Sequence, residues 1–173
     1  QDGGKIVVIE TPFDVEIIEL QEKLNGTVIP YGPRYKRSSV EEKTRQIAAA
    51  RTASAPIAAD MAGYLNKRAK AKGGGEAITG DGDLVADVAA GRQALSAVKE
   101  DELPDNLRVM KPEERQNLIT KQAVERTALT ARMTELVKKR DAFIAEQQKK
   151  QPARTADSFD RVVQGTLKAQ IKR

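Results

Sequence analysis

The 173-residue chain contains no cysteine, no histidine and no tryptophan, and it has only three phenylalanines and three tyrosines. Without thiolates or imidazoles it cannot build the usual zinc sites, a disulfide framework, or the Cys–His and Ser–His pairs that activate catalytic nucleophiles. The lack of cysteine does not by itself identify a compartment. No run of about 18 apolar residues occurs, so the sequence predicts no membrane-spanning helix.

The shortage of aromatic residues also limits the kind of core that the chain can form. Hydrophobic residues make up 39% of the sequence but aromatic residues only 3%, and much of the apolar content is alanine, which buries little area. This composition favours elongated helices with narrow apolar stripes over one compact core. The chain begins Gln1-Asp2-Gly3-Gly4, without an initiator methionine or the pattern of a signal peptide, so we expect it to begin inside a longer protein.

Charge is distributed in blocks of alternating sign. The net charge is −4 over residues 1–33, +7 over 34–75, −6 over 76–107, +5 over 108–150 and +3 over 151–173. Blocks of opposite sign attract one another, so we expect the +7 block to pack near the −6 block. The alternatives are that the basic block forms a surface for anionic polymers, or that the blocks are simply solvated.

The densest basic run is the candidate for contact with a polyanion, or for an intramolecular charge patch. It contains Lys67, Arg68, Lys70 and Lys72. No aromatic residue is interleaved for stacking on bases, so a solvated helix face is the preferred interpretation.

The first 33 residues have the pattern of a strand followed by a helix. Residues 5–9 form a short Val/Ile-rich run typical of a buried strand, which would need partner strands from outside this chain. Thr11 and Pro12 then suit the start of a helix, and Gly26 suits its end. Residues 27–33 contain two prolines and a glycine, so they predict a domain boundary. The sequence therefore predicts the last strand and helix of an α/β domain over 1–33 and a helical module over 34–173.

A second helical region is predicted from Ser39 to about Ala71. Ser39 and Glu42 have the spacing of a capping box, and the sequence that follows is rich in alanine. Pro56 lies inside this region and should kink or split the helix, with Ser54 able to cap the second piece. Three glycines at 73–75 end the region as a flexible joint, and no Lys-Ser or Lys-Thr pair follows them as a phosphate loop would require.

Residues 78–110 predict a turn, a short helix and an apolar anchor. Asp81 and Asp83 match the first two ligand positions of a calcium loop. The loop would also need an oxygen ligand at 85 and a glycine at 86, where the chain has valine and alanine, so we expect only a helix cap at Asp83. Gly91 should interrupt the helix before Leu95 and Val98 continue it. The residues expected to anchor the segment to its neighbours are Leu103, Leu107, Val109 and Met110.

The longest predicted element is one helix near 112–150, since no glycine or proline interrupts it. Glu113 and Glu114 in its first turn suit helix capping, not catalysis. Its apolar positions follow a heptad seam of the coiled-coil type, but Arg126 and Arg140 lie on that seam. We therefore expect one arm of an antiparallel helical hairpin or bundle, packed on the alanine-rich helix. After Pro152, a last amphipathic helix is predicted over 155–171.

Several of these stretches resemble a known family. The run Thr11-Pro12-Phe13-Asp14 and residues 24–32, with the preceding glycines and strand, are similar to the end of a von Willebrand factor type A domain of certain bacterial proteins. Residues 102–107, 111–115, 123–127 and 140–146 resemble the helical extension that follows this domain.

The resemblance implies an exported protein, in the periplasm or at the cell surface. It also implies that the type A domain binds protein ligands through a Mg²⁺ ion held by an Asp-x-Ser-x-Ser loop. That loop does not occur in the 173 residues, so no metal-binding residue is assigned here and any Mg²⁺ would belong to the upstream part of the domain. The type A domain itself and a protein of unknown identity are the implied partners.

The leading hypothesis is therefore a non-catalytic protein-interaction or structural module attached to that domain. The expected fold is mainly α, an elongated helical hairpin or bundle. The rival hypothesis is a basic helical nucleic-acid-binding protein, which the missing aromatics and the acidic block at 76–107 disfavour. An enzyme is the weakest class, because nothing in the sequence resembles a nucleophile with its base.

Overall fold

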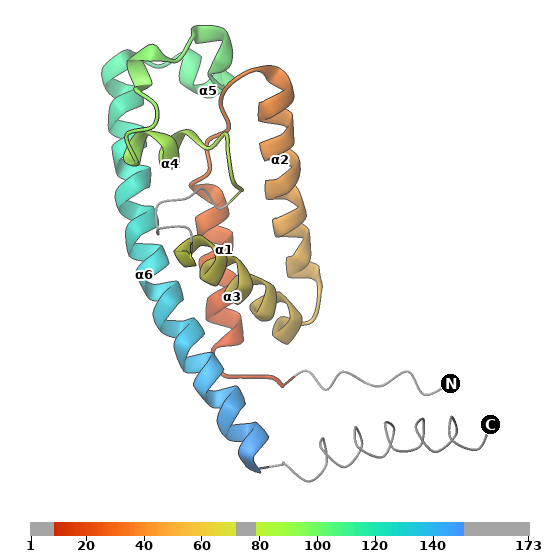
Figure 1. The fold of residues 1–173 in the computed structure, drawn as a ribbon. Helices are drawn as coiled ribbons and strands as arrows, with labels where there is room; N and C mark the ends of the chain where they lie inside the picture. Colours follow the sequence, from red (N-terminus) through yellow and green to blue (C-terminus); the bar gives the residue numbers. More distant parts are fainter. Residues whose placement is uncertain (1–8, 72–78, 151–173) are drawn as a thin grey trace, which may run out of the picture.

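The computed structural model describes residues 9–71 and 79–150, and within these ranges the chain is helical and contains no strand. An isolated antiparallel bridge pairs Pro30 with Asp83. Figure 1 shows a long helix, α6, along one side, with α2 on the opposite side and α1 and α3 between them. The elements are α1 (Asp14–Gly26), α2 (Arg34–Ala49), the short 3₁₀ helix η1 (Ala50–Thr52), α3 (Ala55–Ala71), α4 (Leu84–Ala89), η2 (Leu95–Ala97), η3 (Glu100–Glu102), α5 (Asp105–Arg108) and α6 (Pro112–Lys150).

The first hydrophobic core lies where α1, α3 and α6 meet. On the inward side of α3 the residues are small, and at Gly63 an added Cβ would already be in van der Waals contact with a methyl group of Val137, at 3.7 Å. Small residues allow the helix axes to approach closely, so α3 fits between its two neighbours. The buried members of this core are Ile17, Leu20, Leu24, Ala59, Ala62, Met133, Leu136 and Val137.

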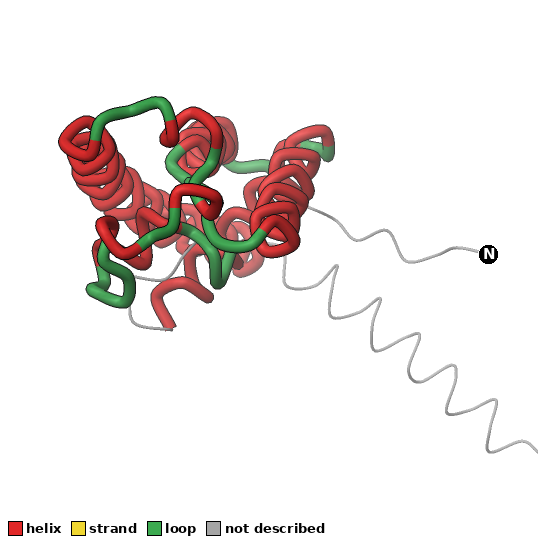
Figure 2. Tube along the Cα trace, turned by 90° about the horizontal axis from the view of Figure 1, so that it is seen from above, coloured by secondary structure: helices red, strands yellow, loops and turns green. Residues whose placement is uncertain are grey.

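A second core joins the connector after α1 to α4, α5 and the first turns of α6. Viewed from above in Figure 2, the loops cross this end of the bundle between the helices. Leu84 N–H donates to the carbonyl of Ile29 at 2.8 Å, and Tyr31 N–H donates to the carbonyl of Gly82 at 3.1 Å. The buried members of this core are Ile29, Leu84, Val85, Leu103, Leu107 and Ile119.

The longest predicted helix is confirmed, because α6 runs unbroken from Pro112 to Lys150. The Glu114 carboxylate accepts a hydrogen bond from Lys111 N–H at 3.0 Å, which is the capping role expected of it. The cap at Asp83 is confirmed as well, since its carboxylate accepts from Val85 N–H at 3.2 Å. The predicted split at Pro56 is also observed: Ala53 is extended and α3 starts at Ala55.

The capping box predicted at Ser39 is wrong. Helix α2 begins five residues earlier, at Arg34, and Ser39 lies in its interior. Pro33 decides the start, because its fixed φ and extended ψ of 151° place its carbonyl to accept from Lys36 and Arg37 N–H at 2.9 and 3.1 Å. The capping-box motif is present in the sequence, but the helix begins upstream of it, directly after Pro33.

Two other expectations need correction. Leu103 and Leu107 are buried anchors as predicted, but Val109 is 86% exposed because it follows the end of α5 and points away from both cores. Beyond Gly91, which has a φ of +72°, the predicted helix does not continue: Leu95 and Val98 lie in and beside the single turn η2.

Helix α6 packs against α1, α3 and α4, not against the alanine-rich α3 alone. Helix α1 therefore shares its core with elements of the predicted C-terminal module, and the boundary at residues 33 and 34 remains a prediction. The predicted strand at 5–9 falls almost wholly outside the described residues. The glycine joint at 73–75 and the last helix at 155–171 also lie outside them.

Candidate functional site

Arg140, near the C-terminal end of α6, joins three helices. Its Nε donates to the Asp14 carboxylate of α1 at 2.8 Å, and its two terminal nitrogens donate to Asp60 of α3 at 2.5 Å and to the Pro56 carbonyl at 3.2 Å. Arg140 and Asp14 are both buried. Burial raises the pKa of Asp14, but the hydrogen bonds from Thr11 and Arg140 outweigh it and hold the pKa below its ordinary value of 3.8.

Arg126, four turns earlier on α6, has the same role at the second core. One terminal nitrogen forms an ion pair with Asp83 at 2.7 Å, and the other two nitrogens donate to the hydroxyl and the carbonyl of Thr27, both at 2.9 Å. Asp83 is completely buried and also accepts from Ile29 N–H at 3.3 Å. The Asp83 carboxylate therefore holds three segments together: the connector that follows α1, the start of α4, and α6.

Both arginine clusters act as structural clamps. All three nitrogens of Arg140 donate hydrogen bonds to protein oxygens, and at Arg126 two nitrogens do so while the third is held by the ion pair with Asp83 without hydrogen-bond geometry. The sequence showed both arginines on the apolar seam of α6, but their carboxylate partners, 43 to 126 residues away in sequence, were not identified. The available signal was that an arginine on a buried stripe requires an acid on the facing element.

The four basic residues singled out in the sequence lie at the end of α3. Lys67 forms an exposed ion pair with Asp141 of α6 at 2.7 Å. Arg68 and Lys70 are exposed on α3, and Lys72 lies outside the described residues. The structure therefore assigns Lys67 to an intramolecular contact between α3 and α6.

The predicted pairing of the basic 34–75 block with the acidic 76–107 block is only partly observed. Arg37 of α2 does reach the acidic block, where it donates to the carbonyls of Asp101 and Leu103 at 2.8 and 3.2 Å. In the part of the chain that the structure describes, however, the carboxylates of that block pair with arginines outside α2 and α3. These arginines are Arg92, Arg108, Arg115 and Arg126.

Large apolar side chains are exposed on the outer face of α3. Ile57, Met61 and Tyr64 are 46%, 44% and 64% exposed, and their spacing of four and three residues places them on one side of the helix. We call these three residues the α3 face. Its orientation is unusual, because α3 directs its alanines inward and its large apolar residues outward. The sequence shows the stripe of large residues but does not show which side of α3 faces the core.

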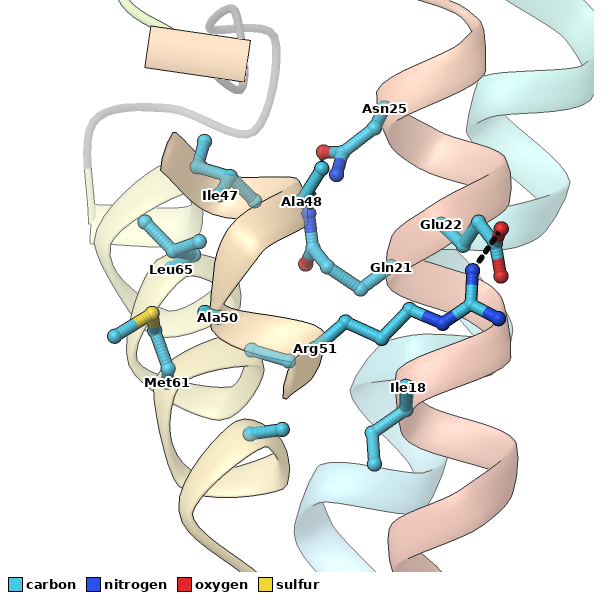
Figure 3. Close-up of a pocket in the computed structure, with 12 residues that line it drawn as sticks. Ile18, Gln21, Glu22, Asn25, Ile47, Ala48, Ala50, Arg51, Met61 and Leu65 are labelled. Carbon is cyan, nitrogen blue, oxygen red and sulfur yellow. Dashed lines mark hydrogen bonds and ion pairs between the residues drawn. The ribbon is translucent and has the colours of Figure 1, made fainter. Parts of the chain in front are cut away.

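A pocket of about 120 Å³ adjoins the α3 face and lies between α1, α2 and α3; we call it the α1–α2–α3 pocket. Figure 3 shows its residues, with α1 on one side, α3 on the other and the end of α2 with η1 between them. Arg51 crosses the opening to form an ion pair with Glu22 at 2.5 Å. The large apolar side chains of the lining are Ile18, Ile47, Met61 and Leu65.

A second pocket, of about 360 Å³, lies between α1, α3, α4 and α6. Alanine is the most frequent residue in its lining, and two of its polar members, Asn66 and Arg126, are engaged with Thr134 and with Thr27 and Asp83. It lacks the outward apolar stripe that extends the α1–α2–α3 pocket into a surface. The α3 face with the α1–α2–α3 pocket is therefore the candidate functional site.

Other kinds of site were sought in the same ranges. Residues 9–71 and 79–150 contain no group of three or more acidic side chains that could hold a metal ion. None of the described helices is long and apolar enough to cross a membrane. No protein-family model, no curated protein and no solved structure matches the chain.

Proposed function

We propose that this chain is a non-catalytic protein-interaction module that holds a partner on the α3 face. The observation that carries the proposal is the exposed row Ile57, Met61 and Tyr64 beside an open apolar pocket. Contiguous apolar surface costs free energy in water, and it is typical of protein-binding sites. The clamp at Arg140 supports the role, because it fixes α3, which carries this surface, to α1 and α6.

The module would belong to an exported bacterial protein and would follow a von Willebrand factor type A domain. This part of the proposal rests on the sequence resemblance described above. In it, α1 is the last helix of the type A domain, and the ion pair between Asp14 and Arg140 fixes the direction in which the helical module leaves that domain. Any Mg²⁺ would be held by the type A domain upstream and not by this module.

The test compares two matched charge substitutions in the full-length protein. Tyr64→Glu and Val124→Glu each place a carboxylate at a similarly exposed apolar residue, 64% and 66% exposed, on different helices. Proteins that co-purify with each variant from the native cells are quantified by isotope-labelled mass spectrometry. We expect one protein to be recovered with wild type and Val124→Glu but lost with Tyr64→Glu. Equal recovery with both variants would contradict the proposal.

A basic helical nucleic-acid-binding protein is the second candidate function. The observation that favours it is the composition of residues 34–71, which contain nine Lys or Arg and three Asp or Glu. Phosphate contacts would then come from exposed residues such as Arg68 and Lys70. A binding measurement with duplex DNA, described below, distinguishes the two candidates.

A further inference from the structure

We infer that the α3 face and the α1–α2–α3 pocket bind an acidic amphipathic helix of a partner protein. This inference rests on the proposed interaction function and adds the chemistry of the partner. Three features lead to it: the spacing of the exposed apolar residues, the size of the pocket and the charge of the surrounding helices.

The apolar part of the surface has the form that a helix recognises. Ile57, Met61 and Tyr64 make a row along α3, and Met61 also lines the pocket, so row and pocket form one continuous surface. An amphipathic helix presents its own apolar residues at the same spacing of three and four and can lie along such a row. Leu65 and Ile47 extend the surface sideways from α3 towards α2.

The pocket favours a protein over a lipid surface. Its volume of about 120 Å³ approaches the roughly 150 Å³ of an apolar cavity that accommodates benzene, so it is the right size for one leucine, isoleucine or phenylalanine side chain. Interfaces gain much of their affinity from one such anchor in a fitted pocket. One anchor side chain of a partner helix would fill the pocket, which is why we take a protein as its occupant.

The charge around the surface selects an acidic partner. Two of the three acids in residues 34–71 are already paired, Glu42 with Arg45 and Asp60 with Arg140. Arg68 continues the α3 face four residues beyond Tyr64, and Arg51 lies at the opening of the pocket, where it is paired with Glu22. A helix with Glu or Asp beside its apolar stripe would meet Arg68 and compete with Glu22 for Arg51, whereas a basic helix would be repelled by Arg68.

The experiment uses synthetic helical peptides of about 18 residues as probes. The test peptide carries leucines at helical spacing with Glu on both flanks. The first control peptide replaces each Glu with Lys, and the second has the sequence of the test peptide scrambled. Binding to the chain is measured by fluorescence anisotropy at two salt concentrations, and self-association of the chain is measured alongside it. We expect the acidic peptide to bind at least about tenfold more tightly than either control, with affinity falling as salt rises.

Single variants then locate the binding site. Met61→Glu changes a half-exposed residue that lines the pocket, and it should lower the affinity for the acidic peptide by at least about tenfold. Arg51→Gln should lower the affinity for the acidic peptide by about threefold and reduce the salt dependence of binding. The matched control is Val124→Glu, which should leave affinity unchanged. Circular dichroism confirms that each variant remains helical.

The inference fails if the acidic and lysine peptides bind equally, if neither binds, or if Val124→Glu weakens binding as much as Met61→Glu. It also fails if anionic phospholipid vesicles bind this surface while the peptide does not, or if a second copy of the chain occupies it. The proposed interaction function would still stand if recovery of a cellular partner depended on Tyr64, and only the acidic helix would then be ruled out as the occupant.

Discussion

Replacing Arg140 with alanine should destabilise the bundle more than any substitution at an exposed ion pair. The change removes the donor to Asp14, which is only 2% exposed, and with it the contacts to Asp60 and the Pro56 carbonyl. Breaking a buried pair by removing one partner costs about 3–5 kcal/mol, because the remaining charge is buried without compensation. Asp14 would keep its hydrogen bonds from Thr11, and Asp60 is 63% exposed to water. We therefore expect Arg140→Ala to lower the free energy of unfolding by about 3 kcal/mol, at the lower end of that range.

The assay is equilibrium unfolding in urea at neutral pH, followed by circular dichroism. Arg132→Ala is the matched control, because Arg132 also joins α6 to α1 through an ion pair, at 2.8 Å to Glu16, but both side chains are nearly half exposed. Water replaces such a partner readily, so the control should differ little from wild type. If Arg140→Ala lost no more stability than Arg132→Ala, the clamp described here would not hold the helices together.

Three further predictions concern the pH dependence of stability, two glycines and the binding of duplex DNA. Because the pKa of Asp14 is held below 3.8 in the folded state, its ionised carboxylate contributes its full stabilisation above that pH and loses it as the pH falls through the folded-state pKa. In urea unfolding, the difference in unfolding free energy between wild type and Asp14→Asn should therefore be constant from pH 5 to 8 and smaller at pH 3. Gly82→Ala should cost at least about 2 kcal/mol in a thermal melt, since Gly82 has a φ of +96° and the added Cβ would lie 2.8 Å from Val40, whereas Gly91→Ala, at a φ of +72° with open space around it, should cost about 1 kcal/mol. Binding to duplex DNA, measured by anisotropy, should be no tighter than about 10⁻⁴–10⁻⁶ M at physiological salt and should fall steeply as salt rises. Nanomolar, sequence-selective binding that disappears in a quadruple glutamine variant would favour the nucleic-acid function; the residues changed are Lys67, Arg68, Lys70 and Lys72.

The elements that local chemistry determines could be predicted from the sequence. The uninterrupted run between Pro112 and Pro152 predicted α6, and Asp83 was recognised as the cap of α4 from its position before an apolar run. The start of α2 was missed because the sequence holds two start signals, at Pro33 and at Ser39, and the helix uses the one at Pro33. Local signals do not show which of two competing starts the rest of the fold will use.

The long-range features could not be predicted in this way. The partners of Arg126 and Arg140 depend on how α6 lies against the connector after α1 and against α3, and sequence spacing carries no information about that arrangement. The α3 face was open to prediction, because Ile57, Met61 and Tyr64 occupy one helical stripe. Its exposure was not, because either the alanines or the large residues of α3 could have faced the core.

The most direct test of the docking role is a photo-crosslinking scan of the full-length protein in its native cells. A photoreactive amino acid replaces, one at a time, the three residues of the α3 face and three exposed apolar residues elsewhere, Val15, Val109 and Val124. We predict that Ile57, Met61 and Tyr64 cross-link to the same partner protein and that the other three positions do not. Equal yields from both sets, or a partner captured only from the second set, would contradict the assignment of α3 as the docking surface.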